Sequence, residues 1–211
     1  MPTFDLFEAI HTQRAIRRFK PDPVPRELVH EVLDAAIRAP SASNRQPWRF
    51  VVVTDPNLKE KLGVLYNEAQ DRRDARNAQM GIEHPTQSDQ VGASSDYLRD
   101  HMGQVPVMVL VCIPRGDSPA SMVRWASIYP AVQNLMLAAR ALGLGTVITT
   151  AHHHVEEEVR ALLGLPEDMD IAALVPMGFP SDEEHFGGGR RKPVEEVTFH
   201  DRWGNPWPAG S

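Results

Sequence analysis

The run VPVMVLVCI, at positions 105–113, is the longest apolar stretch of the chain. A run of this length is too short to cross a bilayer as a helix, which takes about 20 apolar residues. A short continuous apolar run is instead typical of a central strand that is buried on both faces. Such a strand needs cover on both sides, so the run predicts a small sheet with helices on each face.

Helix-like and strand-like patterns alternate along the rest of the chain. Apolar residues at three- and four-residue spacing predict helices, and short apolar runs predict strands. We expect Thr3 to cap the first helix and Gly143 and Gly164 to end later ones. The sequence contains no internal repeat or linker, so it predicts one α+β domain over residues 1–211. The expected helices are 3–12, 26–38, 57–80, 122–142 and 155–164, and the expected strands are 49–54, 105–113, 144–150 and 171–179.

Two segments have little periodicity. Residues 81–103 are rich in Gly, Ser and Asp, which predicts a mobile excursion or lid at about 67–103. Residues 187–211 form an extension that carries Phe199, Trp203 and Trp207 but no core of its own. Because these aromatic residues need a surface to pack on, they predict an obligate homodimer. The alternative is an extension that folds back onto its own subunit.

Charge and cysteine content limit the partners and the location of the protein. There are 22 basic and 28 acidic residues, which give a net charge of −6 and argue against nucleic acid as the main partner. The only cysteine, Cys112, excludes an internal disulfide and fits a reducing compartment. The N-terminus lacks the basic region and the long apolar region of a signal peptide. These features predict a soluble cytoplasmic protein without membrane contact.

Two polar segments are candidate binding sites. Arg14 and Arg17 are three residues apart, so one turn would bring them to the same side, where they could clamp a phosphate. The alternative is a solvated basic edge. In APSASNRQPWRF (39–50), side-chain amides and hydroxyls precede a strand, and these groups suit a flat heterocycle with carbonyl and imide edges. The alternative is a capped turn in which Trp48 belongs to the core.

Several other motifs are absent or ambiguous. The sequence has no glycine-rich dinucleotide fingerprint, P-loop or G-x-S-x-G element. The three histidines at 152–154 are consecutive, so they cannot all ligate one ion, and no metal site is expected. The segment GGGRRKP (187–193) would deliver Arg190 or Arg191 to an anion, or it is a plain surface loop.

Four segments in the same order resemble the nitroreductase superfamily of FMN-dependent oxidoreductases. RAIRRF (14–19) is similar to the R-S-I-R-x-F phosphate segment of the family, and APSASNRQPW (39–48) is similar to A-P-S-x-x-N-x-Q-P-W. AVQNLMLAARALGLGT (131–146) resembles Q-N-L-x-L-A-A-x-x-L-G-L-G. VPMGFP (175–180) and RRKPVEEV (190–197) resemble the closing G-x-P and R-K-P-x-E-E-x-V elements.

The resemblance implies an α+β homodimer with a small mixed or antiparallel sheet, a C-terminal extension that wraps the partner subunit, and FMN at the subunit interface. By position, the residues implied to bind the phosphate are Arg14, Ala15 and Arg17, with Arg191 and Arg190 closing the site. Those implied to line the ribityl chain and ring are Pro40, Ser41, Ala42, Ser43, Asn44 and Gln46. The backbone of Ile148, Thr149 and Thr150 is implied to face the other edge of the flavin.

Two departures from the family pattern stand out. Gln13 replaces the first arginine of the common R-R-S element, and Ala15 replaces its serine. The segment at 67–103 matches no family motif.

The resemblance implies a ping-pong reaction. NADH or NADPH would reduce FMN, and a nitroaromatic, quinone or similar small electrophile would then reoxidise it. The alternatives are a specialised member, either a flavin-fragmenting enzyme or a reductive dehalogenase, and a non-catalytic flavin-binding protein. No catalytic side chain is assigned from the sequence.

Overall fold

The computed structural model describes residues 4–82, 89–116 and 122–208. The helices are α1 (Leu6–Thr12), α2 (Arg26–Ala36), α3 (Pro56–Met80), α4 (Asp89–His101), α5 (Met122–Ala141) and α6 (Glu156–Leu163). The strands are β1 (Arg49–Val53), β2 (Val107–Pro114), β3 (Gly145–Thr146) and β4 (Met169–Gly178). Short 3₁₀ helices are η1 (Ala42–Asn44), η2 (Met102–Gln104), η4 (Ala151–His154) and η5 (Val194–Glu196).

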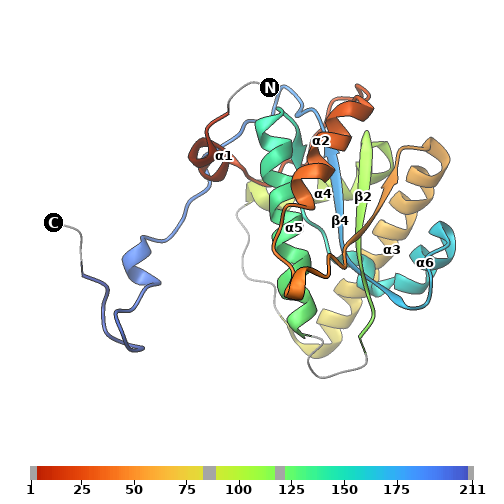
Figure 1. Cartoon of the computed structure of the whole chain (residues 1–211). Helices are drawn as coiled ribbons and strands as arrows, with labels where there is room; N and C mark the ends of the chain where they lie inside the picture. The colour runs from red at the N-terminus through yellow and green to blue at the C-terminus, as the bar shows by residue number, and fades with distance from the viewer. Residues whose placement is uncertain (1–3, 83–88, 117–121, 209–211) are drawn as a thin grey trace.

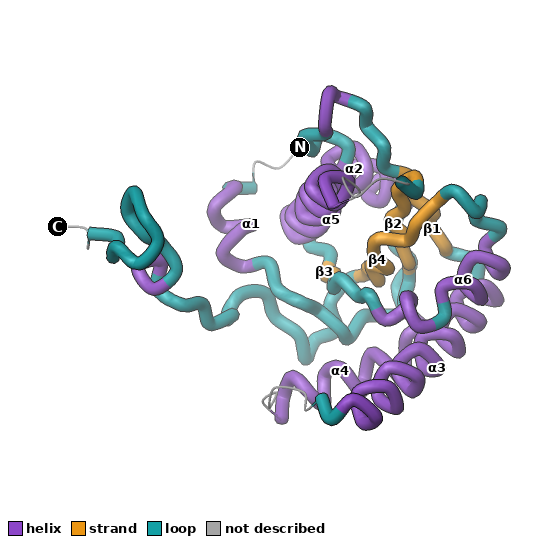
Figure 2. The backbone as a smooth tube through the Cα atoms, turned by 90° about the horizontal axis from the view of Figure 1, so that it is seen from below, coloured by secondary structure: helices purple, strands orange, loops and turns teal. Residues whose placement is uncertain are grey.

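The sheet is small and antiparallel, with the strand order β1-β2-β4-β3. Its central strand β2 contains most of the apolar run, and alternate residues of β2 enter two different cores. Val109 and Val111 pack with α2 and α5, whereas Met108 and Leu110 pack with α3, α4 and α6. Figure 2 shows these two groups of helices on opposite sides of the strands. The predicted α+β fold, with a central strand buried on both faces, is confirmed.

Most helix predictions are confirmed to within a few residues. Asp55 caps α3 by accepting the amide N–H of Leu58, and Gly164 ends α6 in the left-handed conformation. The first helix begins later than expected, at Leu6, with Asp5 as its N-cap. The expected cap Thr3 lies outside the described residues. Pro130 lies within α5, which continues past it to Ala141.

The prediction of an irregular excursion over 81–103 is wrong for the part that the structure describes. Residues 89–101 form α4, and η2 follows directly. Leu98 and Met102 are four residues apart, and their side chains are buried against α3. The many Gly, Ser and Asp residues of the segment hide this helical spacing in the sequence. Residues 83–88 of the expected excursion lie outside the described residues.

The strand expected at 144–150 is much shorter than predicted. Only Gly145 and Thr146 pair continuously with β4, because the chain leaves the sheet edge there and returns at Thr149, which exchanges two backbone hydrogen bonds with Leu174. On its other side β3 meets the N-terminal segment, where the Ile16 N–H donates to the carbonyl of Thr146. The β-branched residues after Thr146 therefore form a loop.

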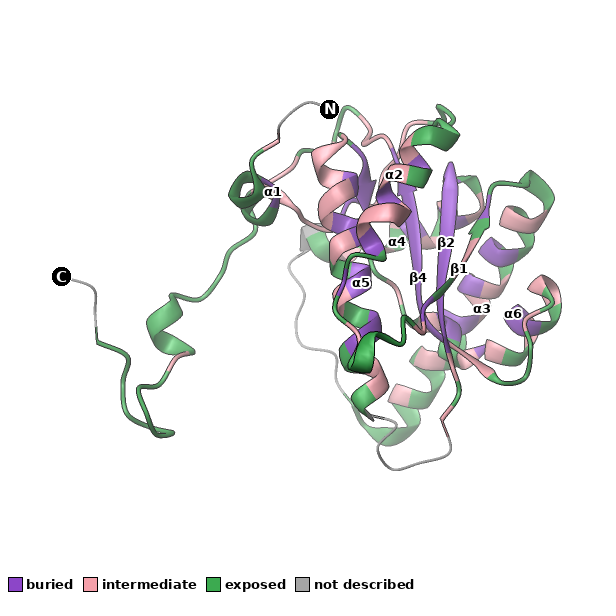
Figure 3. Cartoon of the chain, viewed as in Figure 1, coloured by how far each residue is buried: buried purple, intermediate pink, exposed green. Residues whose placement is uncertain are grey.

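The C-terminal extension leaves the body of the molecule (Figures 1 and 3). Every residue from 188 to 208 is exposed except Thr198, and Trp203 is 90% exposed. Phe199 and Trp203 contact each other, with ring centroids 4.5 Å apart. The extension therefore does not fold back onto its own subunit. Among the described residues, no helix has both the length and the apolar character needed to cross a membrane.

Candidate functional site

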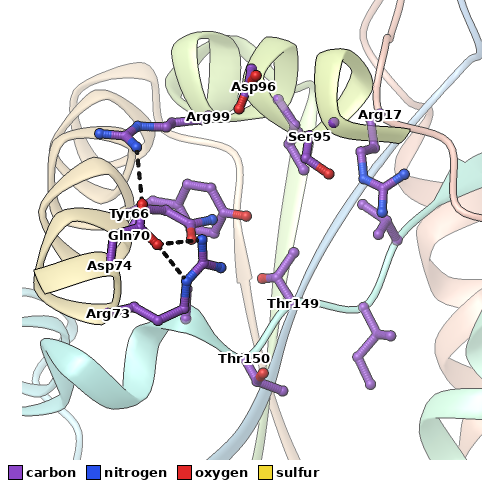
Figure 4. A pocket seen from close by; sticks show the side chains of 15 residues that line it. Arg17, Tyr66, Gln70, Arg73, Asp74, Ser95, Asp96, Arg99, Thr149 and Thr150 are labelled. Atoms are coloured by element: carbon purple, nitrogen blue, oxygen red, sulfur yellow. Dashed lines mark hydrogen bonds and ion pairs between the residues drawn. The ribbon is translucent and has the colours of Figure 1, made fainter. Parts of the chain in front are cut away.

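A cavity of about 590 Å³ lies between α3 and α4 on one side and the loop after β3 on the other (Figure 4). Its volume falls within the range of roughly 300–1,000 Å³ that is common for small-molecule sites. We call its helical side the polar wall, formed by Tyr66, Gln70, Arg73, Ser95 and Arg99. We call its other side the loop wall, formed by residues 147–151. Arg17 lies at one end, on the extended segment after α1.

Helical periodicity builds the polar wall. Tyr66, Gln70 and Arg73 are spaced i, i+4, i+7 along α3, so they lie on one face of this helix. Ser95 and Arg99 are spaced i, i+4 along α4. The loop wall exists because the chain leaves the sheet after Thr146 and presents backbone and small polar side chains in place of a strand.

The arginines of the polar wall are balanced by carboxylates. Arg73 donates to Asp74 Oδ1 at 3.0 and 2.9 Å. Arg99 forms ion pairs with Asp71 and Asp74. Two of the three cavity arginines are therefore held by anions of the protein itself.

Arg17 has a different environment. Partial burial lowers the pKa of Arg17 and is the largest effect, and the nearby charge of Arg14 lowers it further. Tyr66 and Glu184 act in the opposite direction and raise this pKa. A cation in such a place is stabilised by a bound anion. Arg17 is thus the cavity residue best suited to hold a phosphate.

Tyr66 and Gln70 form a buried pair, 7% and 8% exposed. The side chain of Gln70 lies near the Tyr66 phenol and acts to lower its pKa, while Gln70 Oε1 is buried without a partner among the described residues. Burial raises the pKa of Tyr66, against the opposing effects of Gln70 and of the cavity arginines, so the phenol is protonated at neutral pH.

Of the residues proposed from the sequence, the cavity contains Arg17, Ile148, Thr149 and Thr150. Arg14 instead forms an ion pair with Glu184 at 3.2 Å. The expected turn between Arg14 and Arg17 is absent, and Ala15 instead forms a bridge with Thr146. The charge of Arg14 nevertheless lies near enough to Arg17 to lower its pKa.

The loop that follows α2 lies on the opposite side of the sheet from the cavity. The Ala42 N–H donates to Ser127 Oγ of α5 at 3.3 Å, and the 6% exposed Trp48 packs in the core of α2 and α5. The cavity belongs to the other side of the sheet, because Tyr66 packs in the core of α3 and α4. Within one chain, the structure therefore does not bring the following residues to the cavity: Pro40, Ser41, Ala42, Ser43, Asn44 and Gln46.

The same loop has an unusual backbone. Ser43, Asn44 and Gln46 have φ angles of 52°, 52° and 48°, in the left-handed region. The Gln46 N–H donates to Ser41 Oγ at 3.0 Å, and its side-chain amide donates to Asn44 Oδ1 at 3.0 Å. Strained backbone of this kind is concentrated at functional sites. The loop is exposed from residue 42 to residue 46.

Arg190 and Arg191 lie on the extension and are exposed. Arg191 donates to the carbonyl of Arg190 at 3.0 Å, and neither residue lines the cavity. Their proposed role at an anion thus has no counterpart within one chain.

His152 is the buried member of the three consecutive histidines. It is 2% exposed, and its Nε2 lies 3.1 Å from the carbonyl oxygen of Ile171. Burial lowers its pKa to about 4, helped by the neighbouring His153. Nδ1 has no partner among the described residues. A neutral ring that donates from Nε2 fits this environment. Through this contact His152 links the end of the loop wall to β4.

Sequence reasoning missed the whole polar wall. The helix at 57–80 was correctly expected. The i, i+4, i+7 spacing of Tyr66, Gln70 and Arg73 is the sequence signal for this wall. The sequence did not predict the opposing helix α4, and a polar stripe on a single helix is indistinguishable from a solvent-exposed face.

Comparison with known proteins gives consistent matches along the chain. The model of the Nitroreductase family matches residues 10–179. An NADH dehydrogenase of Thermus thermophilus is 33% identical, over 94% of this chain and 97% of its own length. A putative NADH dehydrogenase/NAD(P)H nitroreductase of Methanothermobacter thermautotrophicus is 31% identical, over 84% of this chain and 78% of its own.

The fold also matches solved structures. A crystal structure of oxidised iodotyrosine deiodinase bound to FMN and 3-iodo-L-tyrosine has a TM-score of 0.71 and 24% sequence identity. The match covers 90% of this chain and 96% of that one.

Proposed function

The chain belongs to the nitroreductase family, and we propose that it is an FMN-dependent oxidoreductase. It takes reducing equivalents from NADH or NADPH and passes them to a small electrophilic acceptor, such as a nitroaromatic compound or a quinone. The observation that carries this proposal is the cavity, which combines Arg17, a partly buried cation with no ion pair among the described residues, with the polar backbone of Ile148–Thr150.

The cavity residues fit half of an FMN site. Arg17 would hold the phosphate or another polar edge of the cofactor, and the loop wall would face the flat ring. Arg14 would contribute only by exchanging its ion pair with Glu184 for the cofactor. FMN, when bound, supplies hydride chemistry, while the protein binds, orients and shields the reactants.

The other half of the site would come from a second copy of the chain. The strained loop of residues 40–46 and the cavity lie on opposite sides of the sheet. The loop and the cavity of one chain therefore cannot contact the same cofactor, whereas the loop of one chain and the cavity of another can. The exposed aromatic residues of the extension and the exposed Leu6 and Phe7 of α1 also favour such a dimer. We propose a homodimer in which Ser41–Gln46 of one subunit complete the cavity of the other.

The visible spectrum of the purified protein tests the cofactor. We expect a yellow protein, or a colourless one that takes up added FMN with a perturbed flavin band. A protein that does neither is not a flavoprotein, and the proposal fails.

Anaerobic mixing with NADH or NADPH separates an enzyme from a flavin-binding protein. Rapid bleaching followed by recovery of colour on addition of nitrobenzene or 1,4-benzoquinone supports the oxidoreductase. A flavoprotein that neither reductant bleaches is a binder. The specialised activities, flavin fragmentation and reductive dehalogenation, stay predictions, and release of iodide from 3-iodotyrosine would support the second.

A further inference from the structure

The polar wall contains a hydroxyl group whose position is fixed and whose proton has no acceptor among the described residues. The Tyr66 ring is 7% exposed and packs in the core of α3 and α4, which fixes the position of its hydroxyl group. Figure 4 shows the phenol pointing from α3 into the cavity, toward the side where Ser95 and Arg17 lie. The phenol proton is therefore available to a molecule in the cavity.

Three neighbouring donors are already engaged within the protein. Arg73 and Arg99 are held by Asp74 and Asp71. The Thr149 hydroxyl donates to the carbonyl of Leu174 at 2.8 Å. Among these groups, Tyr66 combines burial, a fixed oxygen and an uncommitted proton.

The two walls of the cavity suggest where an acceptor would lie. This step rests on the proposed function, in which the loop wall faces the flat ring of the cofactor. The polar wall would then lie across the cavity from the residues that hold the ring. An acceptor that receives a hydride must come within about 3.5 Å of its donor, so it would occupy the part of the cavity beside Tyr66.

We propose that Tyr66 is a catalytic residue, which donates a hydrogen bond and then a proton to the oxygen of the acceptor as it is reduced. For a nitroaromatic compound, one N–O bond breaks and the oxygen leaves as water. The bound cofactor would supply a hydride, which is two electrons and one proton, and Tyr66 would supply the second proton. The phenolate recovers its proton from solvent, so the step balances.

The Tyr66→Phe variant tests this role, because it removes one oxygen atom and keeps the ring that fills the wall. The two half-reactions are measured separately by anaerobic rapid mixing. We expect the rate of flavin reduction by NADH or NADPH to change less than twofold. We expect reoxidation by nitrobenzene to slow by about 100-fold or more, the usual contribution of a general acid.

The other two tyrosines provide matched controls. Tyr97 does not line this cavity and stacks on His101, with ring centroids 4.0 Å apart. Tyr129 lies on α5 with its hydroxyl 3.4 Å from the carbonyl oxygen of Ala172. Tyr97→Phe and Tyr129→Phe should leave reoxidation within about twofold of the wild-type rate.

A binding measurement gives a readout apart from turnover. Acetophenone has an aromatic ring and a carbonyl oxygen but no nitro group, and its binding to the oxidised protein can be followed through the flavin band. Tyr66→Phe should weaken its binding by roughly threefold to tenfold, the usual effect of one neutral hydrogen bond. Equal affinity would contradict the contact.

The Gln70→Leu variant tests whether Gln70 acts through Tyr66, as a positioning residue. The Gln70 contact lowers the pKa of Tyr66, so its loss should raise that pKa. A general acid acts only while it is protonated, so the reoxidation rate falls as the pH rises through the pKa of Tyr66. In Gln70→Leu this fall should begin at a higher pH than in the wild type. Gln79→Leu, at an exposed position of the same helix, should leave the profile unchanged.

The possible failures are distinguishable. A protein without flavin, or one that no nicotinamide reduces, contradicts the proposed function. A protein that is reduced normally, but whose Tyr66→Phe variant is reoxidised by nitrobenzene at the wild-type rate, retains the proposed function and overturns the role of Tyr66.

Discussion

Arg14 and Arg17 differ at the scale of single residues, although both belong to the RAIRRF segment. Arg14 forms an ion pair with Glu184 at 3.2 Å, whereas Arg17 lines the cavity. The partner of Arg14 is a carboxylate of the same chain. Arg17 has no ion pair among the described residues, and we propose that its partner is an anion brought by a ligand.

The Arg17→Ala variant should bind FMN at least tenfold more weakly than the wild type, about the effect of one charge-assisted hydrogen bond. Fluorescence quenching of FMN on titration with apoprotein measures this. Arg26→Ala removes the same charge from the exposed start of α2 and should leave the affinity unchanged. Unchanged affinity in Arg17→Ala would contradict the assignment.

His152 links the stability of the loop wall to pH. Its pKa is about 4 in the folded protein, against a usual value of 6.5, because burial disfavours the charged ring. As the pH falls through this window, the unfolded chain binds a proton that the folded chain does not. Stability is therefore complete above about pH 6.5 and is lost as the pH falls toward 4, by about 3 kcal/mol in all.

Urea unfolding between pH 4 and pH 7 measures this dependence. The His152→Gln variant keeps an N–H for the Ile171 carbonyl but cannot titrate, so its free energy of unfolding should fall less steeply below pH 6.5. His30→Gln, at an exposed position of α2, should retain the wild-type slope. A wild-type slope in His152→Gln would assign the pH dependence to other groups.

At the scale of elements, α3 and η2 make a backbone contact that only glycine permits. A Cβ atom on Gly63 would lie 2.6 Å from the backbone nitrogen of Gly103. This contact brings the end of the α4–η2 segment against α3 and thus sets the separation of the helices that form the polar wall.

Gly63→Ala should therefore lower the free energy of unfolding by roughly 1–3 kcal/mol, although alanine is the better helix former. Gly92→Ala in α4 is the matched control, because nothing lies within 4 Å of the added Cβ. That variant should be neutral or slightly more stable. Equal thermal midpoints of the two variants would show that the α3–η2 contact tolerates a wider spacing.

The sequence predicted the elements that have strong local signals. The apolar run of β2, the apolar stripe of α2 and the glycine that ends α6 each depend on neighbouring residues alone, and each is confirmed. The helix α4 and the short β3 depend on distant contacts. Leu98 is buried because it packs against α3, and β3 ends where its hydrogen bonding to the segment around Ile16 ends.

The candidate site was harder to predict, and the reason lies at the scale of the whole molecule. Family resemblance named Arg17 and Ile148–Thr150, which do lie together in the cavity. It also named Ser41–Gln46 and Arg190–Arg191, which do not reach that cavity within one chain. No pattern in one sequence states which copy of the chain supplies a residue.

The exposed extension gives a test of assembly. Trp203 is 90% exposed and Trp207 45% exposed in the single chain, and burial of such side chains dominates many interfaces. If they pack on a partner, the Trp203→Ala, Trp207→Ala double variant should raise the dimer dissociation constant by at least about tenfold. Analytical ultracentrifugation measures this. Val64→Ser on α3 removes another exposed apolar side chain and should have no effect.

The left-handed residues of the 40–46 loop have a consequence for the order of assembly. Each of Ser43, Asn44 and Gln46 holds a conformation that costs of order 1–3 kcal/mol, and folding of the single chain already meets this cost. In the proposed homodimer, the loop would therefore lose little conformational entropy when it meets a second subunit. The exposed extension has few contacts with its own chain, so it would become ordered only on docking. We therefore expect two subunits to recognise each other first through their rigid loops, with the extensions ordering afterwards to lock the pair.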